Sequence, residues 1–218
     1  MKPELKIDES WKYDIQALEP ESDEFEFIRH FLTTTKTRFL FEKKQVEVVQ
    51  IYKVIEQHAK EPHGGSSNNL MLFHATKGNG AAGILQNGFF NSRDGMFGAG
   101  VYMTDCSSTA AHWGRFGKDD GLMNIFVNEV LQSENLQTVA KDPLKYYNYP
   151  TEFAFAKHAG TGSRELSEED YKRDHLGRRY RNIQVEDKFS EEYVADCKLV
   201  IPRYLIRAKL DKTIKMIF

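Results

Sequence analysis

The chain has 218 residues, a formal net charge of −2 and 40% hydrophobic residues. This near-neutral balance excludes a strong overall attraction to nucleic acid or to an anionic membrane surface. The length and the apolar content suit one hydrophobic core, and 15 Phe and 10 Tyr residues make that core partly aromatic. We therefore expect a single domain over residues 1–218.

The two cysteines, Cys106 and Cys197, show no short-range pairing pattern. Two reduced thiols are typical of a protein from the cytosol or the nucleus. No apolar stretch approaches the roughly 18 residues of a membrane span, and the N-terminus lacks the apolar run of a signal peptide. We expect a soluble intracellular protein, nuclear or cytoplasmic, without membrane association.

Residues 10–60 predict a strand followed by two helices. The strand is expected within Trp11–Leu18. Ser22, with Asp23 and Glu24 after it, indicates a helix start, because serine caps free amide groups and acids favour the positive end of the helix dipole. The second helix is predicted over Gln45–Ala59. Apolar residues recur at helical spacing in both: Phe25, Ile28 and Leu32 in the first, and Val48, Ile51, Tyr52, Ile55 and Ala59 in the second.

Strands dominate the rest of the predicted structure. Leu70–Phe73 is a short apolar run after a loop rich in turn residues, and Gly121–Leu131 places Met123, Ile125 and Val127 at a period of two. Two further strands, Tyr193–Ile201 and Tyr204–Leu210, are expected to be separated at Pro202. Helices first and mostly strands afterwards predict an α+β fold. Residues 138–190 are long, polar and without a clear period, which is typical of a functional or mobile stretch.

Three segments combine residue types that suit chemistry. The first is a strand that ends at His74, followed by a short helix that ends at Gly88, a residue typical of a helix C-terminus. The second runs Met96-Phe97-Gly98-Ala99-Gly100-Val101-Tyr102-Met103-Thr104-Asp105 and continues into a helix that carries Trp113. The third is Glu191-Glu192-Tyr193-Val194, which puts an acid at the start of a late strand. Each feature alone is common in structural or surface positions, and the Gly-Ala-Gly segment lacks the third glycine of a dinucleotide fingerprint.

Together and in this order the three segments resemble the catalytic domain of the poly(ADP-ribose) polymerase (PARP) family. That family carries a His-Gly-Thr/Ser strand end, a Met-Phe-Gly-x-Gly-Ile/Val-Tyr block, a Glu-Tyr-Val strand and a Pro-x-Tyr-Leu-Ile strand. The last of these reads Pro202-Arg203-Tyr204-Leu205-Ile206 here. The resemblance implies an ADP-ribosyltransferase fold, a mostly antiparallel two-sheet core with short N-terminal helices. It also implies an NAD-binding core at about residues 68–210.

The resemblance implies a catalytic triad of His74, Tyr102 and Glu192, with NAD as the substrate. A histidine can fix a ribose hydroxyl, and a tyrosine ring offers nicotinamide a flat face for stacking. A carboxylate stabilises the positive charge that develops on the ribose as nicotinamide leaves, as in glycoside cleavage. We also expect Ala75, Thr76, Gly98, Ala110 and Trp113 to contact NAD. No metal is needed, and the sequence shows no metal-ligand spacing.

Two alanines depart from the family pattern at the nicotinamide carboxamide. Ala75 replaces a glycine whose backbone pairs with the carboxamide, and its methyl group is expected to crowd that contact. Ala110 replaces a serine that bonds the same group, and loss of a neutral hydrogen bond costs about 1 kcal/mol, or about five-fold in affinity. Trp113 replaces a second stacking tyrosine and preserves an aromatic face.

The catalytic glutamate has two candidates. The following Tyr-Val favours Glu192, whereas the spacing back from Pro202 favours Glu191. Neighbouring residues of a strand face opposite sides, so only one of the two can enter the pocket. We assign Glu192 on the assumption that the turn near Asp196 is one residue shorter than in the family.

Three functions fit this pattern. The first is a transferase that adds one or many ADP-ribose units to a protein or another macromolecule. The second is a non-catalytic NAD-binding or interaction module, suggested by Ala75 and Ala110, and the third is an NAD glycohydrolase. The segment before His74 is too short for the large helical domain of DNA-dependent family members, and we expect no DNA-binding module in this chain. The acceptor and the oligomeric state do not follow from the sequence.

Overall fold

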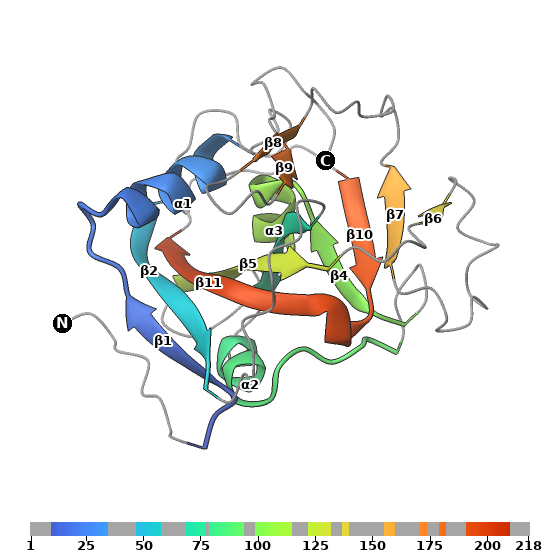
Figure 1. Cartoon of the computed structure of the whole chain (residues 1–218), viewed down its shortest axis with the longest axis horizontal. Coiled ribbons are helices and arrows are strands. Elements are labelled where there is room, and N and C mark those ends of the chain that lie inside the picture. Colours follow the sequence, from blue (N-terminus) through green and yellow to red (C-terminus); the bar gives the residue numbers. More distant parts are fainter. Residues whose placement is uncertain are drawn as a thin grey trace.

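The computed structural model describes residues 10–34, 47–57, 69–76, 79–93, 99–114, 122–131, 137–139, 155–159, 171–173, 179–181 and 191–209. Three α-helices lie in these ranges: α1 (Asp23–Thr34), α2 (Gly80–Asn87) and α3 (Ser107–Gly114). None of them is long and apolar enough to cross a membrane. The strands, shown with the helices in Figure 1, are β1 (Tyr13–Ala17), β2 (Glu47–Glu56), β3 (Leu70–Thr76), β4 (Val101–Thr104), β5 (Leu122–Val130), β6 (Gln137–Val139), β7 (Phe155–Ala159), β8 (Tyr171–Arg173), β9 (Arg179–Arg181), β10 (Glu191–Ala195) and β11 (Val200–Lys209).

The strands form one mostly antiparallel sheet in the order β1-β2-β11-β5-β3-β4-β10-β7-β6. Only the β6–β7 and β3–β9 pairs are parallel. The sheet has two blocks, β1 to β3 and β4 to β6 in this order, which are joined through one opposed residue pair, Phe73 and Thr104. The expected α+β class is confirmed, and the expected two sheets are these two blocks of a single hydrogen-bonded path.

The first predicted strand and helix are confirmed. β1 pairs with β2 along its whole length. Ser22 precedes α1, and its Oγ accepts a hydrogen bond from the backbone N–H of Phe25 at 3.2 Å, which satisfies one of the free amide groups of the first turn. Asp23, Glu24 and Glu26 lie in that turn, where negative charge is favourable.

The predicted helix over Gln45–Ala59 is wrong, because Glu47–Glu56 forms the strand β2. The strand lies between β1 and β11 and has a buried residue on each face. Ile51 faces the core beneath α1, whereas Val54 faces the core beside α2. Burial on both faces removes the alternation of polar and apolar residues that would have revealed a strand, and the remaining apolar spacing matched a helix. The N-terminal part therefore has one described helix, not two.

The expected separation of the last strands at Pro202 is also wrong. Pro202 lies within β11, and the chain turns earlier, through a short 3-10 helix at Cys197–Leu199. At Pro202 the strand pairs with β5 alone, since the pairing with β2 begins at Tyr204. A residue without a backbone N–H is tolerated at such an edge, and the register shifts between Pro202 and Tyr204.

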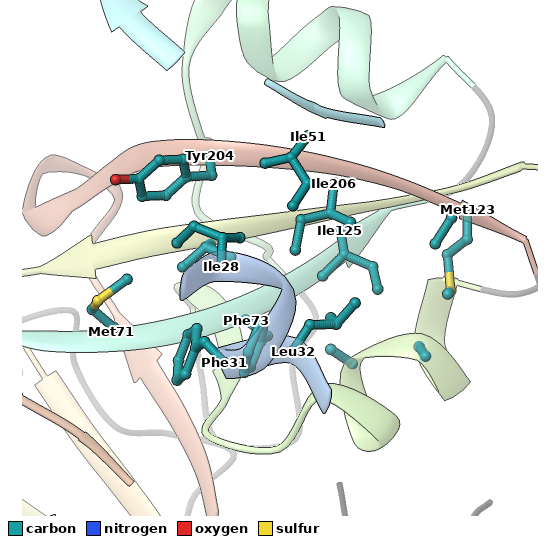
Figure 2. Packing of buried hydrophobic residues seen from close by; sticks show 14 of the residues in the cluster. Ile28, Phe31, Leu32, Ile51, Met71, Phe73, Met123, Ile125, Tyr204 and Ile206 are labelled. Carbon is teal, nitrogen blue, oxygen red and sulfur yellow. The ribbon is translucent and has the colours of Figure 1, made fainter. Parts of the chain in front are cut away.

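Two hydrophobic cores lie on opposite faces of the sheet. The α1 core contains buried residues of α1, of the central strands and of α3, and Figure 2 shows Phe31 stacked on Phe73 within it. The ring centroids of that pair are 4.6 Å apart. The α2 core contains Ala81 and Leu85 of α2 with side chains of β1, β2, β3, β4, β5, β10 and β11. In Figure 1 the helices α1 and α2 lie on opposite sides of the central strands. The strand β3 is therefore held from both faces up to the point where it meets β4.

Candidate active site

His74 lies where β3 and β4 separate. The two strands share the opposed pair Phe73 and Thr104, and β3 continues beyond it to Thr76. Past that pair the His74 ring takes the place of a ladder hydrogen bond, because its Nδ1 lies 2.8 Å from the backbone oxygen of Tyr102. The structure thus brings the His74 ring to the backbone of Tyr102, at an opening between two strands.

The contact with Tyr102 fixes the protonation of the histidine. A carbonyl oxygen only accepts hydrogen bonds, so Nδ1 of His74 carries the proton and donates it. Burial lowers the pKa of His74 below its ordinary 6.5, and the hydrogen bond to the Tyr102 backbone opposes this to a lesser extent. The ring is therefore neutral at pH 7, and Nε2 keeps a lone pair. An imidazole in this state offers Nε2 as an acceptor for a hydroxyl group.

Aromatic rings support His74 from one side. Phe89 meets the histidine ring edge-on, with centroids 5.1 Å apart and an interplanar angle of 85°. Phe126, which is opposite His74 in the sheet, meets Phe89 at 6.0 Å and 74°. Phe89 reaches this place because α2 ends at Gly88, whose φ of 82° is open to glycine and strained for other residues. The predicted short helix ending at Gly88 is confirmed, and its end helps to orient the histidine.

Tyr102 is the second residue of β4, which pairs with β10 on its other side. Gly100, just before β4, allows this pairing to be close, because a Cβ there would collide with Cγ1 of Val194 and lie 3.1 Å from the Ala195 carbonyl oxygen. Gly98, expected to contact NAD, lies outside the described residues. At Gly100, therefore, the glycine-rich segment allows the chain to pack closely against β10.

The register of β10 distinguishes the two glutamate positions. Residue 192 is opposite Thr104, and Val194 is opposite Tyr102. The described pairing of β10 with β4, the strand of Tyr102, begins at position 192. Position 191 pairs, among the described residues, with Ala159 of β7. The 3-10 turn at Cys197–Leu199 lies between β10 and β11 in the chain.

The backbone of Ala75 lies beside the opening. The Tyr102 carbonyl points toward β3, and backbone groups of alternate residues point to the same side of a strand. The backbone groups of Thr104 therefore also point toward β3, where Thr104 pairs with Phe73. Ala75 is two residues after Phe73, so its N–H and C=O point toward β4. The single described pair between these strands ends before Ala75. A carboxamide has the donor and acceptor that such a strand edge matches.

The remaining expected contacts lie on α3 and at the end of β3. Ala110 is 2% exposed and packs in the α1 core, whereas Trp113 is 60% exposed. Helix α3 packs against β3, β4 and β5, so both residues are carried on an element next to the opening. Thr76 ends β3 with its hydroxyl against Gly80, where a Cβ would collide with Oγ1. The start of α2 therefore fits closely over the end of β3.

Sequence reasoning missed two residues that shape this site. Phe89 was not expected beside the histidine, and Gly114 was not noticed although it directly follows Trp113. The signal for Phe89 was its place after a helix-ending glycine; for Gly114 it was a glycine inside the last turn of a helix, which is unfavourable without a packing reason. No group of three or more His, Cys, Asp or Glu that could hold a metal ion occurs among the residues that the structure describes.

Comparisons with known proteins show the family of this chain. The model of the poly(ADP-ribose) polymerase catalytic domain family matches residues 22–210. The chain is 25% identical over 162 residues to poly [ADP-ribose] polymerase 1 of Gallus gallus, which covers 71% of this chain and 15% of that protein. It is 32% identical over 111 residues to poly [ADP-ribose] polymerase 2-B of Oryza sativa subsp. japonica, covering 46% of this chain and 18% of the relative. A Zea mays poly [ADP-ribose] polymerase 2 is equally similar, at 32% over 111 residues.

The chain spans less than a fifth of the length of these curated relatives. The family match nevertheless covers most of the chain and includes β3, β4, α3, β10 and β11, the elements around the opening at His74. At the level of the family, the activity is NAD-dependent ADP-ribosyl transfer with NAD as substrate. The chain therefore belongs to the poly(ADP-ribose) polymerase catalytic domain family.

Proposed function

We propose that this chain cleaves the nicotinamide–ribose bond of NAD and transfers ADP-ribose to a protein or another macromolecule. The observation that carries the proposal is the His74–Tyr102 contact at the opening between β3 and β4 in a chain of this family. Because that contact leaves a neutral histidine with Nε2 as an acceptor, His74 is suited to hold a ribose hydroxyl of NAD.

The nicotinamide end would be held by a backbone edge and aromatic faces. The N–H and C=O of Ala75 face the opening and match the carboxamide, while Tyr102 and Trp113 offer rings for stacking. Thr76 follows on the same strand, and we expect it to contact the ribose. Ala110 offers only a methyl group, which is buried in the α1 core. We therefore expect nicotinamide to bind more weakly than it would with a serine at position 110.

The chemical step requires a negative charge at the ribose. As the C–N bond breaks, its electron pair leaves with nicotinamide, and C1′ of the ribose develops positive charge. A carboxylate at position 192, where β10 begins to pair with the strand of Tyr102, would stabilise that charge and orient the incoming nucleophile. The nucleophile then bonds to C1′ and releases its proton. No metal is needed for this sequence of steps.

One observation favours a second function. The buried methyl of Ala110 removes a polar contact with the carboxamide, so the chain could hold NAD or ADP-ribose without turning it over. Such a module would serve interaction rather than catalysis. The balance between the two functions depends on whether the Ala75 edge and the two rings hold nicotinamide in a reactive position.

Incubation with NAD labelled in the adenosine half, with parallel measurement of released nicotinamide, tests the proposal. We expect label in a macromolecule and equimolar nicotinamide in solution. The size distribution of the labelled product separates one added unit from a chain of units. Free labelled ADP-ribose alone indicates a glycohydrolase, and binding without nicotinamide release indicates the non-catalytic module; both outcomes contradict transfer.

A further inference from the structure

Ala75 and Gly114 face each other between β3 and α3, where there is space for one methyl group but not for two. A Cβ built on Gly114 would lie 2.7 Å from Cβ of Ala75 and 3.4 Å from Cγ of Met123. Real Cβ contacts essentially never fall below 3.0 Å, so residue 114 cannot carry a side chain while residue 75 keeps its methyl and the helix stays in place. Gly114 is buried, which leaves no solvent space into which either group could move.

The methyl of Ala75 points away from His74. Alternation along β3 puts Ala75 on the face of Phe73, and both belong with the α1 core. His74 contacts Phe89, which belongs to the α2 core. The methyl therefore projects toward the last turn of α3 and not toward the face on which the histidine lies. The methyl group of Ala75 is therefore next to Gly114, and there is space for this methyl because residue 114 has no side chain.

Trp113 links this contact to the proposed nicotinamide site. It precedes Gly114 in the last turn of α3, and it is 60% exposed. A Cβ at position 114 would push that turn away from β3, because the backbone of β3 is held in the sheet by β5 and cannot retreat. The displacement would carry the Trp113 ring with it, and a shift of about 1 Å in a binding group can cost a large factor in activity.

We propose that Gly114 is a positioning residue that compensates for Ala75 and holds Trp113 at the distance from β3 that nicotinamide needs. The proposal rests on the function proposed above and adds to it the reason why a glycine-to-alanine change at position 75 is compatible with a working site. It makes residues 75 and 114 an exchangeable pair, in which one methyl is allowed and two are not.

The test compares Gly114→Ala, Ala75→Gly and the double variant, which exchanges the two residues. All three are made in a Trp11→Phe background, so that Trp113 is the only tryptophan. The readouts are acrylamide quenching of Trp113, the Kd of nicotinamide from that fluorescence, and kcat and KM for NAD. We expect Gly114→Ala alone to change the quenching and to raise the Kd and the KM about 10-fold or more. The exchange variant should return the quenching, the Kd and the KM to within about two-fold of the parent.

Gly83→Ala is the matched control, because a Cβ at this helical glycine of α2 would meet nothing within 4 Å. It should leave all three readouts unchanged, which separates the pair from a general effect of alanine in a helix. Unfolding in urea is followed for every variant. A merely structural role would lower stability in Gly114→Ala without moving the Kd or the Trp113 quenching, and that result overturns the proposal. Failure of the exchange variant to restore binding, although it is as stable as the parent, also overturns it.

The outcomes separate this inference from the proposed function. If the parent modifies a macromolecule with NAD but Gly114→Ala binds nicotinamide normally, only the role of Gly114 is wrong. If the coupling between residues 75 and 114 is seen in nicotinamide binding but NAD is never turned over, only the transferase proposal is wrong. A parent that binds no nicotinamide contradicts both.

Discussion

The two faces of β3 differ although they belong to neighbouring residues. Phe73 stacks on Phe31 in the α1 core, fully buried and surrounded by apolar side chains. His74, the next residue, faces the α2 core, donates to the Tyr102 carbonyl and keeps a second ring nitrogen as an acceptor. One face is closed by packing, and the other ends at an opening where β4 separates. The polar face of His74 is itself packed up to Leu72 by the α2 core, so β3 is held from both faces where it meets β4 through a single pair.

The substitution expected to disturb the packing of the closed face most is removal of the Phe31 ring. Phe31→Ala takes a large buried side chain from its stack on Phe73, and the cavity should lower the free energy of unfolding by about 3–5 kcal/mol. Phe90→Ala is the control, because Phe90 is 72% exposed, and it should change stability by less than about 0.5 kcal/mol. Urea unfolding measures both. Equal effects of the two substitutions would contradict the assignment of α1 to the core that holds β3.

A substitution of His74 on the polar face should instead lower the catalytic activity. His74→Ala removes the acceptor Nε2 and the bond to the Tyr102 carbonyl, so kcat/KM for nicotinamide release should fall on the order of 100-fold, or about 2.7 kcal/mol. His30→Ala, an exposed histidine on α1, should keep full activity. Initial rates with NAD measure the effect. A His74→Ala enzyme that keeps its rate would show that the histidine is not part of the site.

Lowering the pH should reduce the stability and the activity that depend on His74 before it affects the packing around Phe73. The pKa of folded His74 is below 6.5 because burial disfavours its charged form, whereas the unfolded histidine titrates near 6.5. Between those values the unfolded chain binds more protons, so the stability from this residue is complete above about pH 6.5 and is lost as the pH falls toward the folded pKa. The rate of nicotinamide release should fall in the same range, because protonated Nε2 no longer accepts a hydrogen bond.

This pH dependence is measured against His74→Gln. The difference in unfolding free energy between the wild type and His74→Gln should decrease from pH 7 toward pH 5. A difference that increases toward acid would mean that the folded protein prefers the charged histidine, and the assigned protonation state would be wrong.

The smallest expected effect concerns the carboxamide. Ala110→Ser restores a hydroxyl beside the proposed site and should lower the KM for NAD about five-fold, equivalent to about 1 kcal/mol. Ala111→Ser is the control, since Ala111 is equally buried in the α1 core but is not among the residues expected to contact NAD. It should lower stability without improving the KM. An unchanged KM in Ala110→Ser would mean that nicotinamide does not approach α3 at this residue.

The sequence was informative where one local signal decided the structure. Ser22 before two acids predicted the start of α1, and Gly88 predicted the end of α2, because capping and positive φ depend on few residues. The predicted helix over Gln45–Ala59 was wrong because a strand with buried residues on both faces does not alternate between polar and apolar residues. The partners of this strand, β1 and β11, also come from other parts of the chain. Long-range pairing of this kind overrides local propensity.

The site was predictable as a set of residues but not as an arrangement. The motifs around His74 and Tyr102 indicated the family and therefore a shared pocket. The hydrogen bond between the histidine ring and a backbone carbonyl, and the fit of Ala75 against Gly114, depend on how β3, β4 and α3 meet. Such contacts arise from packing between separate elements, and a pattern along one segment does not contain them.

The central claim is that His74, Tyr102 and the acid at position 192, where β10 begins to pair with β4, act on one NAD molecule. The most direct test is the initial rate of nicotinamide release from NAD by wild type, Glu192→Gln and Glu191→Gln, each checked for normal unfolding in urea. Glu192→Gln should lower the rate about 10²–10³-fold, and Glu191→Gln should keep it within about two-fold. Loss of the rate in Glu191→Gln with activity retained in Glu192→Gln would contradict the assigned register and the triad built on it.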